Sequence, residues 1–267
     1  MSLDLPTLLE LARHVVDQAA RRLRTARPTT ILPKGDRDVL TDLDLRTEHD
    51  IRAALRAATP GFGFLGEEEG GDPAGTHWVL DPIDGTVNFI RGLPLCGISL
   101  ALIEHGTPVL GVIALPFLNR CYWAASGAGA WRDGHPIHAS TAGSLPGTVL
   151  AVGDYGTGSG AADRNRIALA LHARLAPTVQ RIRMLGSAAV DLALVADGTL
   201  DASITLGNRP WDMAAGTVIA REAGAAVVDL DGSPHTTASR ATIATAAPLR
   251  PALLQIVNAA QTATPSL

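Results

Sequence analysis

Apolar and polar positions alternate with the period of a helix over much of the first sixty residues. Between residues 4 and 25 the apolar positions fall on one face, which predicts an amphipathic helix. A second helix is expected to begin at Thr41 and to end before Thr59-Pro60-Gly61, because proline and glycine interrupt helical hydrogen bonding. On that helix Asp44 and Glu48 are four residues apart and therefore share a face.

The middle of the chain favours strands. Runs with β-like composition cover residues 62–65, 77–80, 96–104, 109–115, 121–125 and 129–132. The segment His105-Gly106-Thr107-Pro108 between two of these runs is typical of a hairpin turn. We expect the run from His77 to stop at Asp81-Pro82, because proline has no N–H to donate to a neighbouring strand.

Beyond about residue 140 strands and helices alternate, which is an α/β layout. Strands are expected at residues 149–152, 179–184, 201–206, 225–229 and 242–245, and helices at residues 164–175, 187–196, 211–223 and 248–260. The Gly- and Pro-containing stretch 141–148 is interpreted as a seam. The chain is therefore expected to have an N-terminal half, residues 1–140, and a C-terminal half, residues 141–267.

Composition narrows the class of protein. The 267 residues are 46% hydrophobic, enough for a large core, and the formal net charge is −4. This mildly acidic balance gives no general attraction to nucleic acid or to an anionic membrane surface. The N-terminus lacks the pattern of a signal peptide, and no apolar run approaches the ~20 residues that span a bilayer. Cys96 and Cys121 lack a CxxC spacing, so we expect free thiols and a cytoplasmic location.

Candidate chemistry is concentrated in Asp81-Pro82-Ile83-Asp84-Gly85-Thr86. Its two carboxylates repel each other unless they are protonated or paired with a cation, and no Lys or Arg lies within the segment. Mg²⁺ suits such a pair, because it prefers oxygen ligands and keeps sites for water and phosphate. Gly85 allows close backbone approach to a ligand, and a helix starting at Thr86 would offer free N–H groups to phosphate. Taken alone, a turn with surface acids is the favoured explanation of this segment.

Three other acidic segments allow a structural and a functional interpretation. Glu67 and Glu68, in a glycine-framed acidic run, can hold metals or orient a water, or can form a solvated loop. Asp44 can orient a hydroxyl or water, or can serve with Thr41 in helix capping. Asp212, after Pro210-Trp211, can be a metal ligand or a favourable acid in the first turn of a helix.

Taken in order, these segments resemble the inositol monophosphatase family of Mg²⁺-dependent, Li⁺-sensitive phosphatases. The residues that carry the resemblance are Asp38-Val39-Leu40-Thr41 with Asp44, Gly66-Glu67-Glu68, Asp81 to Thr86 with Asn88-Phe89, Gly186-Ser187-Ala188-Ala189, and Trp211-Asp212. Each segment is weak alone, but the ordered set covers nearly the whole chain and is specific. It implies the layered αβαβα sandwich of the sugar phosphatase type, with mixed α+β and α/β character.

The resemblance also implies a site with two or three Mg²⁺ ions. Glu67, Asp81 and the Ile83 carbonyl correspond to the ligands of the first ion, and Asp81, Asp84 and Asp212 to those of the second. Glu67 also corresponds to a ligand of a weaker third ion. In such a site a metal-activated water attacks phosphorus in line with the leaving oxygen.

Other residues match catalytic and substrate-binding positions of the family. Asp44 and Thr86, with Glu68 nearby, match the group that positions the attacking water. The residues expected to contact the substrate are Asp84, the N–H groups of Gly85 and Thr86, the segment Gly186, Ser187 and Ala188, and the positions Thr205 and Arg209. Lys34 matches a lysine ahead of the first motif, where its role is at most electrostatic.

One departure from the family pattern concerns the substrate. Inositol-hydrolysing members have a glutamate seven residues before the Asp of the Trp-Asp pair, and this chain has Thr205 there. Arg209 can meet an anionic substrate group or simply be solvated. We therefore expect a phosphatase acting on a small phosphorylated metabolite: an inositol, sugar, nucleotide or histidinol phosphate. The alternative is a non-catalytic, phosphometabolite-binding or scaffold relative. By the same resemblance we expect a homodimer.

Overall fold

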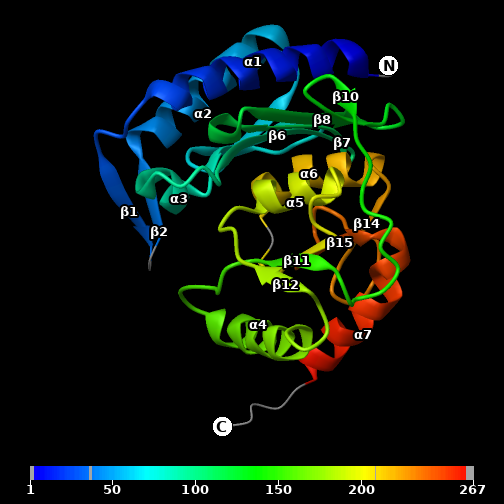
Figure 1. Cartoon of the computed structure of the whole chain (residues 1–267). Helices are drawn as coiled ribbons and strands as arrows, with labels where there is room; N and C mark the ends of the chain where they lie inside the picture. Colours follow the sequence, from blue (N-terminus) through cyan, green and yellow to red (C-terminus); the bar gives the residue numbers. More distant parts are fainter. Residues whose placement is uncertain (1–2, 36–37, 208, 263–267) are drawn as a thin grey trace.

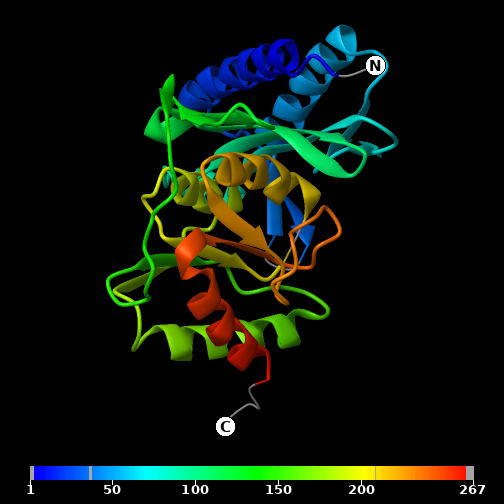
Figure 2. The same cartoon turned by 90° about the vertical axis from the view of Figure 1, so that its right-hand side faces the viewer.

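Helices and sheets are stacked in alternating layers in the computed structural model, which describes residues 3–35, 38–207 and 209–262. The outermost layer pairs α1 (Leu5–Thr25) with α2 (Asp42–Ala58). A larger sheet, the helices α5 (Ala188–Ala196) and α6 (Pro210–Glu222), a smaller sheet, and the helices α4 (Ala161–Leu175) and α7 (Arg250–Gln261) follow in turn (Figures 1 and 2). None of the described helices combines the length and apolarity required to cross a membrane.

The larger sheet has the strand order β10-β9-β8-β7-β6-β5-β3-β4 and is antiparallel except between β3 and β5. Its strands are β3 (Gly63–Gly66), β4 (Gly70–Asp72), β5 (His77–Asp84), β6 (Gly97–Glu104), β7 (Thr107–Leu115), β8 (Arg120–Ala125), β9 (Ala130–Arg132) and β10 (His135–Pro136). Alternate residues of β6 face opposite sides, as strand geometry requires. Ile98 and Leu100 pack in the cluster below α1 and α2, whereas Ala101 and Ile103 pack toward α5 and α6.

The smaller sheet has the order β12-β11-β13-β15-β14. Its strands are β11 (Val149–Val152), β12 (Arg181–Arg183), β13 (Ala202–Thr205), β14 (Ala225–Val228) and β15 (Thr242–Ala246). A separate apolar cluster joins one face of this sheet to α4 and α7. The helix α5 joins the two sheets, because it contacts β13 and β15 of the smaller sheet on one side and β6 and β7 of the larger sheet on the other.

Two close contacts fix α6 in the middle layer. A Cβ atom on Gly111 of β7 would come within 2.4 Å of the Ala215 carbonyl oxygen, and a Cβ atom on Gly216 within 2.4 Å of Leu192. Glycine at both positions lets α6 lie directly on β7 and on α5. α6 belongs to the predicted C-terminal half, 141–267, but packs on strands of the predicted N-terminal half, 1–140. The division into two halves therefore stays a prediction.

The structure corrects the expected end of the strand that begins at His77. β5 continues to Asp84, with partners Asp81–Ser99 and Asp84–Gly97 and a shift of register between them. The bulge takes up an extra residue, so Pro82 interrupts the ladder without ending the strand. A helix does start at Thr86, namely α3 (Thr86–Arg91).

Several short elements lay outside the sequence prediction. β1 (Ile31–Gly35) and β2 (Asp38–Thr41) form a hairpin, and the short 3₁₀ helices η1 (Pro116–Leu118) and η2 (Ala247–Leu249) precede β8 and α7. The side chains of the β1 strand are exposed, so it lacks the alternation of apolar and polar residues that marks a half-buried strand. The hairpin matters for the site, since β1 carries Lys34.

Candidate metal and active site

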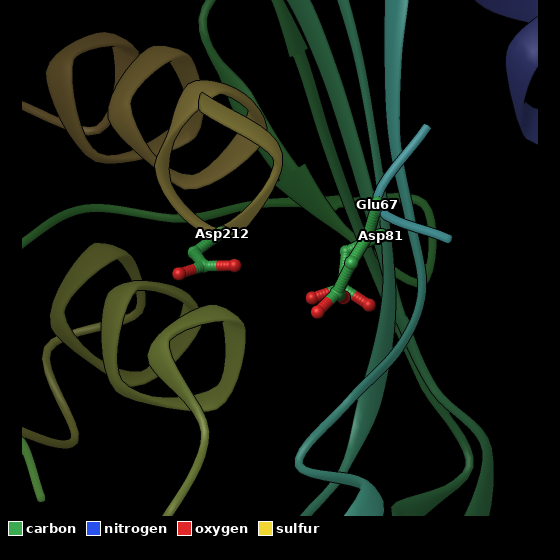
Figure 3. A group of neighbouring side chains, drawn as sticks. All are labelled: Glu67, Asp81 and Asp212. Carbon is green, nitrogen blue, oxygen red and sulfur yellow. The ribbon is translucent and has the colours of Figure 1, made fainter. Parts of the chain in front are cut away.

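Three carboxylates from distant parts of the chain converge at one edge of the larger sheet. Oxygen atoms of Glu67, Asp81 and Asp212 all lie within 4.8 Å of one another. Asp81 comes from β5 and Glu67 from the turn after β3, and Asp212 faces them from the first turn of α6 (Figure 3). Asp81 is buried and the other two are partly exposed. This arrangement offers several oxygen ligands to one point that solvent can reach.

Asp81 is held by its own strand. Its Oδ1 accepts a hydrogen bond of 3.0 Å from the Ile83 N–H, which fixes the side chain across the bulge. Burial raises the pKa of Asp81 well above its usual value, and the charges of Glu67, Asp84 and Asp212 raise it further. These shifts mean that the ionised cluster is unfavourable without a cation.

Asp84 lies beside the three-carboxylate group and is held from the opposite side of the site. Its Oδ2 accepts a 2.8 Å hydrogen bond from the Ser187 hydroxyl and another from the Ala189 N–H. Burial raises the pKa of Asp84 to about 6, against these hydrogen bonds. The charge of Asp84 in turn raises the pKa values of Asp81 and Asp212. One oxygen of Asp84 is thus committed to the N-terminus of α5.

Asp212 depends on the way α6 is anchored. The Ser99 hydroxyl donates a 3.0 Å hydrogen bond to the carbonyl of Trp211, and Ser99 is the cross-strand partner of Asp81. A single buried serine therefore ties the residue before Asp212 to the strand beside Asp81. Burial raises the pKa of Asp212 well above its usual value, followed by the charges of Asp84 and Glu67, while Arg209 opposes this rise.

Glu67 and Glu68 occupy the tight turn between β3 and β4, in which Gly66 pairs with Gly70. Lys34 from the β1 hairpin reaches both of them, with its Nζ 2.7 Å from Glu67 Oε1 and 2.9 Å from Glu68 Oε1. Burial raises the pKa of Glu68 to about 7, although Lys34 opposes the shift. The positive charge of Lys34 therefore offsets part of the negative charge of Glu67 and Glu68.

The structure confirms the capping interpretation of Asp44 and leaves its catalytic role a prediction, because its two oxygens have different partners. Oδ2 accepts hydrogen bonds from the N–H and hydroxyl of Thr41, at 2.8 and 2.6 Å, and so completes a capping box at the start of α2. Oδ1 faces the Thr86 hydroxyl at 3.1 Å, and that hydroxyl also lies 3.0 Å from the Ile83 carbonyl. The pair expected to position a water is thus assembled. Burial raises the pKa of Asp44, and the hydrogen bonds from Thr41 and Thr86 oppose that rise.

The residues expected to contact the substrate lie at or beside the ends of α3, α5, β13 and α6. Gly85 has φ of 89° and caps α3, and a Cβ atom there would lie 3.1 Å from the Gly186 carbonyl oxygen. Ser187 caps α5 and Ala188 opens it. Thr205 ends β13 next to Gly153. Arg209 is the N-cap residue of α6, with its guanidinium 6.0 Å from the Trp211 ring centroid; its neighbour Asn208 lies outside the described residues.

Sequence reasoning gave no site role to four residues that matter in the structure. Glu48 and Arg52 of α2 contact the backbone of the Glu67 turn, Ser99 holds α6, and Asp191 is a buried acid of α5 whose pKa is raised by burial and by Asp84. Glu48 had a usable signal. It lies on the face of α2 that carries Asp44, Ile51 and Leu55 in a helical repeat, and charged residues on a buried face require partners.

The donor set fits a hard divalent cation. Carboxylate oxygens dominate it, the carboxylates of Asp81 and Asp212 have raised pKa values, and the nearest described cations, Lys34 and Arg209, carry less positive charge than the four acids carry negative. Mg²⁺ prefers oxygen ligands and retains waters. An added divalent cation would relieve the repulsion that the scaffold imposes on these side chains.

The raised pKa of Asp84 predicts how stability depends on pH without metal. Its pKa is about 6 in the folded protein against 3.8 in the unfolded chain, so the folded state holds the proton more tightly. In EDTA we expect the free energy of unfolding to fall as pH rises from about 4 through 6, by up to about 3 kcal/mol from this group. Urea titrations of the parent and of Asp84→Asn should show a shallower fall for the variant.

The control for that experiment is Asp50→Asn, which removes a partly exposed carboxylate of α2 paired with Arg22. It should leave the pH dependence of the parent unchanged. An Asp84→Asn protein that loses stability with pH as steeply as the parent would contradict the assignment of the shift to Asp84.

Comparisons with known proteins place the chain in a family. A model of the inositol monophosphatase family matches residues 4–263. The probable inositol 1-monophosphatase ImpA of Mycobacterium tuberculosis is 38% identical over 258 residues, 96% of this chain and 91% of that protein. A histidinol-phosphatase of the same organism is 36% identical, over 87% of this chain and 90% of that protein.

Comparison with solved structures gives the same result for the fold. A solved IMPase of Thermotoga maritima superimposes with a TM-score of 0.87 and 31% identity, over 95% of this chain and 98% of that one. The expected layered sandwich is therefore confirmed, and so is the resemblance read from the ordered segments around Asp44, Glu67, Asp81 and Asp212. The chain belongs to the inositol monophosphatase family.

Proposed function

We propose that this phosphoric monoester hydrolase is a Mg²⁺-dependent enzyme that hydrolyses the phosphate ester of a small metabolite by attack of water. The observation that carries the proposal is the convergence of Glu67, Asp81 and Asp212 within 4.8 Å. Such a group of acids favours a divalent cation, and a phosphate monoester is an anion that needs one to approach it.

Two or three Mg²⁺ ions are proposed, held by Glu67, Asp81, the Ile83 carbonyl, Asp84 and Asp212. When bound, Mg²⁺ would neutralise the phosphate and lower the pKa of a bound water. The Ile83 carbonyl faces the Thr86 hydroxyl, and its second lone pair remains for a further ligand. Asp84 would contribute the oxygen that does not accept from Ser187 and Ala189.

The chain's own residues supply the placement of the water and its proton. The Thr86 hydroxyl can donate to Asp44 Oδ1, which turns its lone pairs toward a neighbouring water. Glu68 has a pKa of about 7 and so is a suitable acceptor for the proton near neutral pH. The N–H groups of Gly85 and Thr86, at the start of α3, precede the first internal hydrogen bonds of that helix and would bind phosphate oxygens.

The organic part of the substrate would lie between the N-terminus of α5 and the end of β13. Gly186, Ser187 and Ala188 would line one side, and Thr205 and Arg209 the other. Thr205 offers a hydroxyl and a methyl group in place of a carboxylate, which weakens recognition of several neighbouring hydroxyl groups. Sugar, nucleotide and histidinol phosphates therefore join inositol phosphates as candidate substrates.

A homodimer in the cytoplasm completes the proposal. The two cysteines, Cys96 and Cys121, are unpaired in the structure, which suits a reducing compartment. The chain mass is 27.7 kDa, so light scattering of the purified protein should give a mass of about twice that value. A mass equal to one chain, unchanged over a range of protein concentrations, would contradict the dimer.

Replacing a proposed metal ligand tests catalysis directly. Asp212→Asn keeps the shape of the side chain but removes its charge, and we expect phosphate release to fall by more than about 10²-fold, as for loss of a single transition-state contact. EDTA should abolish activity of the parent and Mg²⁺ restore it, while Li⁺ should inhibit. The binding-only alternative predicts no phosphate release from any substrate, with or without Mg²⁺.

The control for Asp212→Asn is Asp231→Asn, because Asp231 has an exposed carboxylate that bonds only locally, to Ser233. It should match the parent. Asp212→Asn turning over as fast as the parent, in a folded protein, would remove the basis of the proposal.

Thr205 generates a prediction about specificity. In a panel of inositol, sugar, nucleotide and histidinol phosphates, we expect Thr205→Glu to raise kcat/KM for inositol phosphate relative to the other substrates, by about 10-fold or more for a regained charged hydrogen bond. The conservative control is Thr205→Ser, which keeps the hydroxyl. An unchanged order of preference in Thr205→Glu would show that this position does not contact the substrate.

A further inference from the structure

The acidic turn between β3 and β4 rests on a buried ion pair of α2. The Glu48 carboxylate has no exposed surface and lies directly beneath the turn. The Glu68 N–H donates to its Oε2 at 2.9 Å, and the Glu69 N–H to its Oε1 at 3.0 Å. Backbone N–H groups that point at a carboxylate form strong, charge-assisted hydrogen bonds.

All three N–H groups of the turn, those of residues 67–69, have hydrogen-bond partners. The third N–H group, that of Glu67, donates to the Leu80 carbonyl of β5 at 3.1 Å. The turn is thus fixed on one side to the strand that carries Asp81 and on the other side to Glu48. With its backbone fixed in this way, the Glu67 side chain has few other directions in which to point.

Arg52 completes the support one helical turn further along α2. Its guanidinium donates to Glu48 Oε1 at 2.5 Å and to the Gly70 carbonyl at 2.8 Å, and it lies 4.5 Å above the Phe64 ring. The positive charge of Arg52 offsets the negative charge of Glu48. The Glu48–Arg52 pair therefore adds little to the repulsion on Glu67. The hydrogen bond from Arg52 to the Gly70 carbonyl holds the C-terminal end of the turn.

Gly66 explains how the carboxylate comes so close. A Cβ atom on Gly66 would lie 2.2 Å from the Glu48 Cδ and between 2.1 and 2.5 Å from its two oxygens. Any side chain at position 66 would displace the carboxylate. Glycine before the two glutamates therefore serves the contact with Glu48.

We propose that Glu48 is a positioning residue for metal binding, which with Arg52 holds the Glu67 turn in its binding geometry before a cation arrives. This inference rests on the proposed metal-dependent function. It follows from a physical need: Glu67 is repelled by Asp81 and Asp212, and a turn free to move would carry it away from them. Partners that orient a metal ligand commonly change metal affinity by about 10–100-fold when removed.

The test is Glu48→Gln, a change of nearly equal shape. A neutral amide accepts more weakly, and its NH₂ group opposes either a turn N–H or Arg52. Calorimetric titration with Mg²⁺ alone, without substrate, should show a Kd raised by about 10–100-fold. In activity assays the Mg²⁺ requirement should rise while kcat recovers at saturating Mg²⁺. Deuterium exchange in EDTA should be faster over residues 66–70 in the variant.

Two outcomes separate this inference from the proposed function. If the parent binds no Mg²⁺, the proposed function fails. If the parent binds Mg²⁺ and folded Glu48→Gln binds it equally well, the positioning role fails, even where the variant has a lower Tm. Asp50→Asn, also on α2, should bind Mg²⁺ as the parent does.

A milder variant keeps the test decisive if Glu48→Gln does not fold. Arg52→Lys retains the positive charge but lacks the planar fork that reaches both Glu48 and the Gly70 carbonyl. We expect a smaller increase in the Kd for Mg²⁺ than in Glu48→Gln, together with faster exchange over residues 66–70. Parent-like Mg²⁺ affinity in folded Arg52→Lys would overturn the role given to the ion pair.

Discussion

Repulsion among carboxylates of like charge is the constraint on which the architecture of this site depends. The charges of Glu67, Asp84 and Asp212 raise the pKa of Asp81, and those of Asp84 and Glu67 raise the pKa of Asp212, so a flexible chain would separate the four carboxylates. Three of them are each held by a different contact. The Ile83 N–H holds Asp81, the N-terminus of α5 holds Asp84, and the anchoring of α6 by Ser99 places Asp212.

The layered fold supplies the rigidity that this constraint demands. α6 lies directly on β7, where Gly111 meets Ala215, and directly on α5, where Gly216 meets Leu192. Its first turn therefore cannot shift away from the larger sheet without opening well-packed apolar contacts. Such contacts resist small displacements, because protein interiors are packed as densely as molecular crystals. The site's geometry is thus set by packing before any ligand binds.

The helices and the buried strands could be predicted well from the sequence, because their hydrophobic patterns are clear. The apolar face of α1 and the continuous apolar runs of β6 and β7 are visible in the sequence, because buried positions in these elements are apolar. The ordered acidic segments also led to the family, which the comparisons confirm. What periodicity misses is structure held by exposed or polar contacts, and the β1 hairpin with Lys34 is of this kind.

Two features needed three-dimensional information for physical reasons. Pro82 ends a regular ladder, but a bulge that absorbs one residue lets β5 resume pairing at Asp84, and nothing local in the sequence signals the bulge. The partner of Asp84 is 103 residues away at Ser187. A segment expected to line the substrate pocket therefore also holds Asp84, a second role that only its position in space reveals.

On the proposed function, Thr205 is separate from the contacts that hold the metal ligands, although the segment Gly186, Ser187 and Ala188 serves both Asp84 and the substrate. Glu67, Asp81 and Asp212 depend on the β3–β4 turn, on β5 and on the anchoring of α6. Thr205 ends β13 and takes part in none of these contacts. A change at position 205 can therefore alter which alcohol is accepted while the carboxylates keep their places.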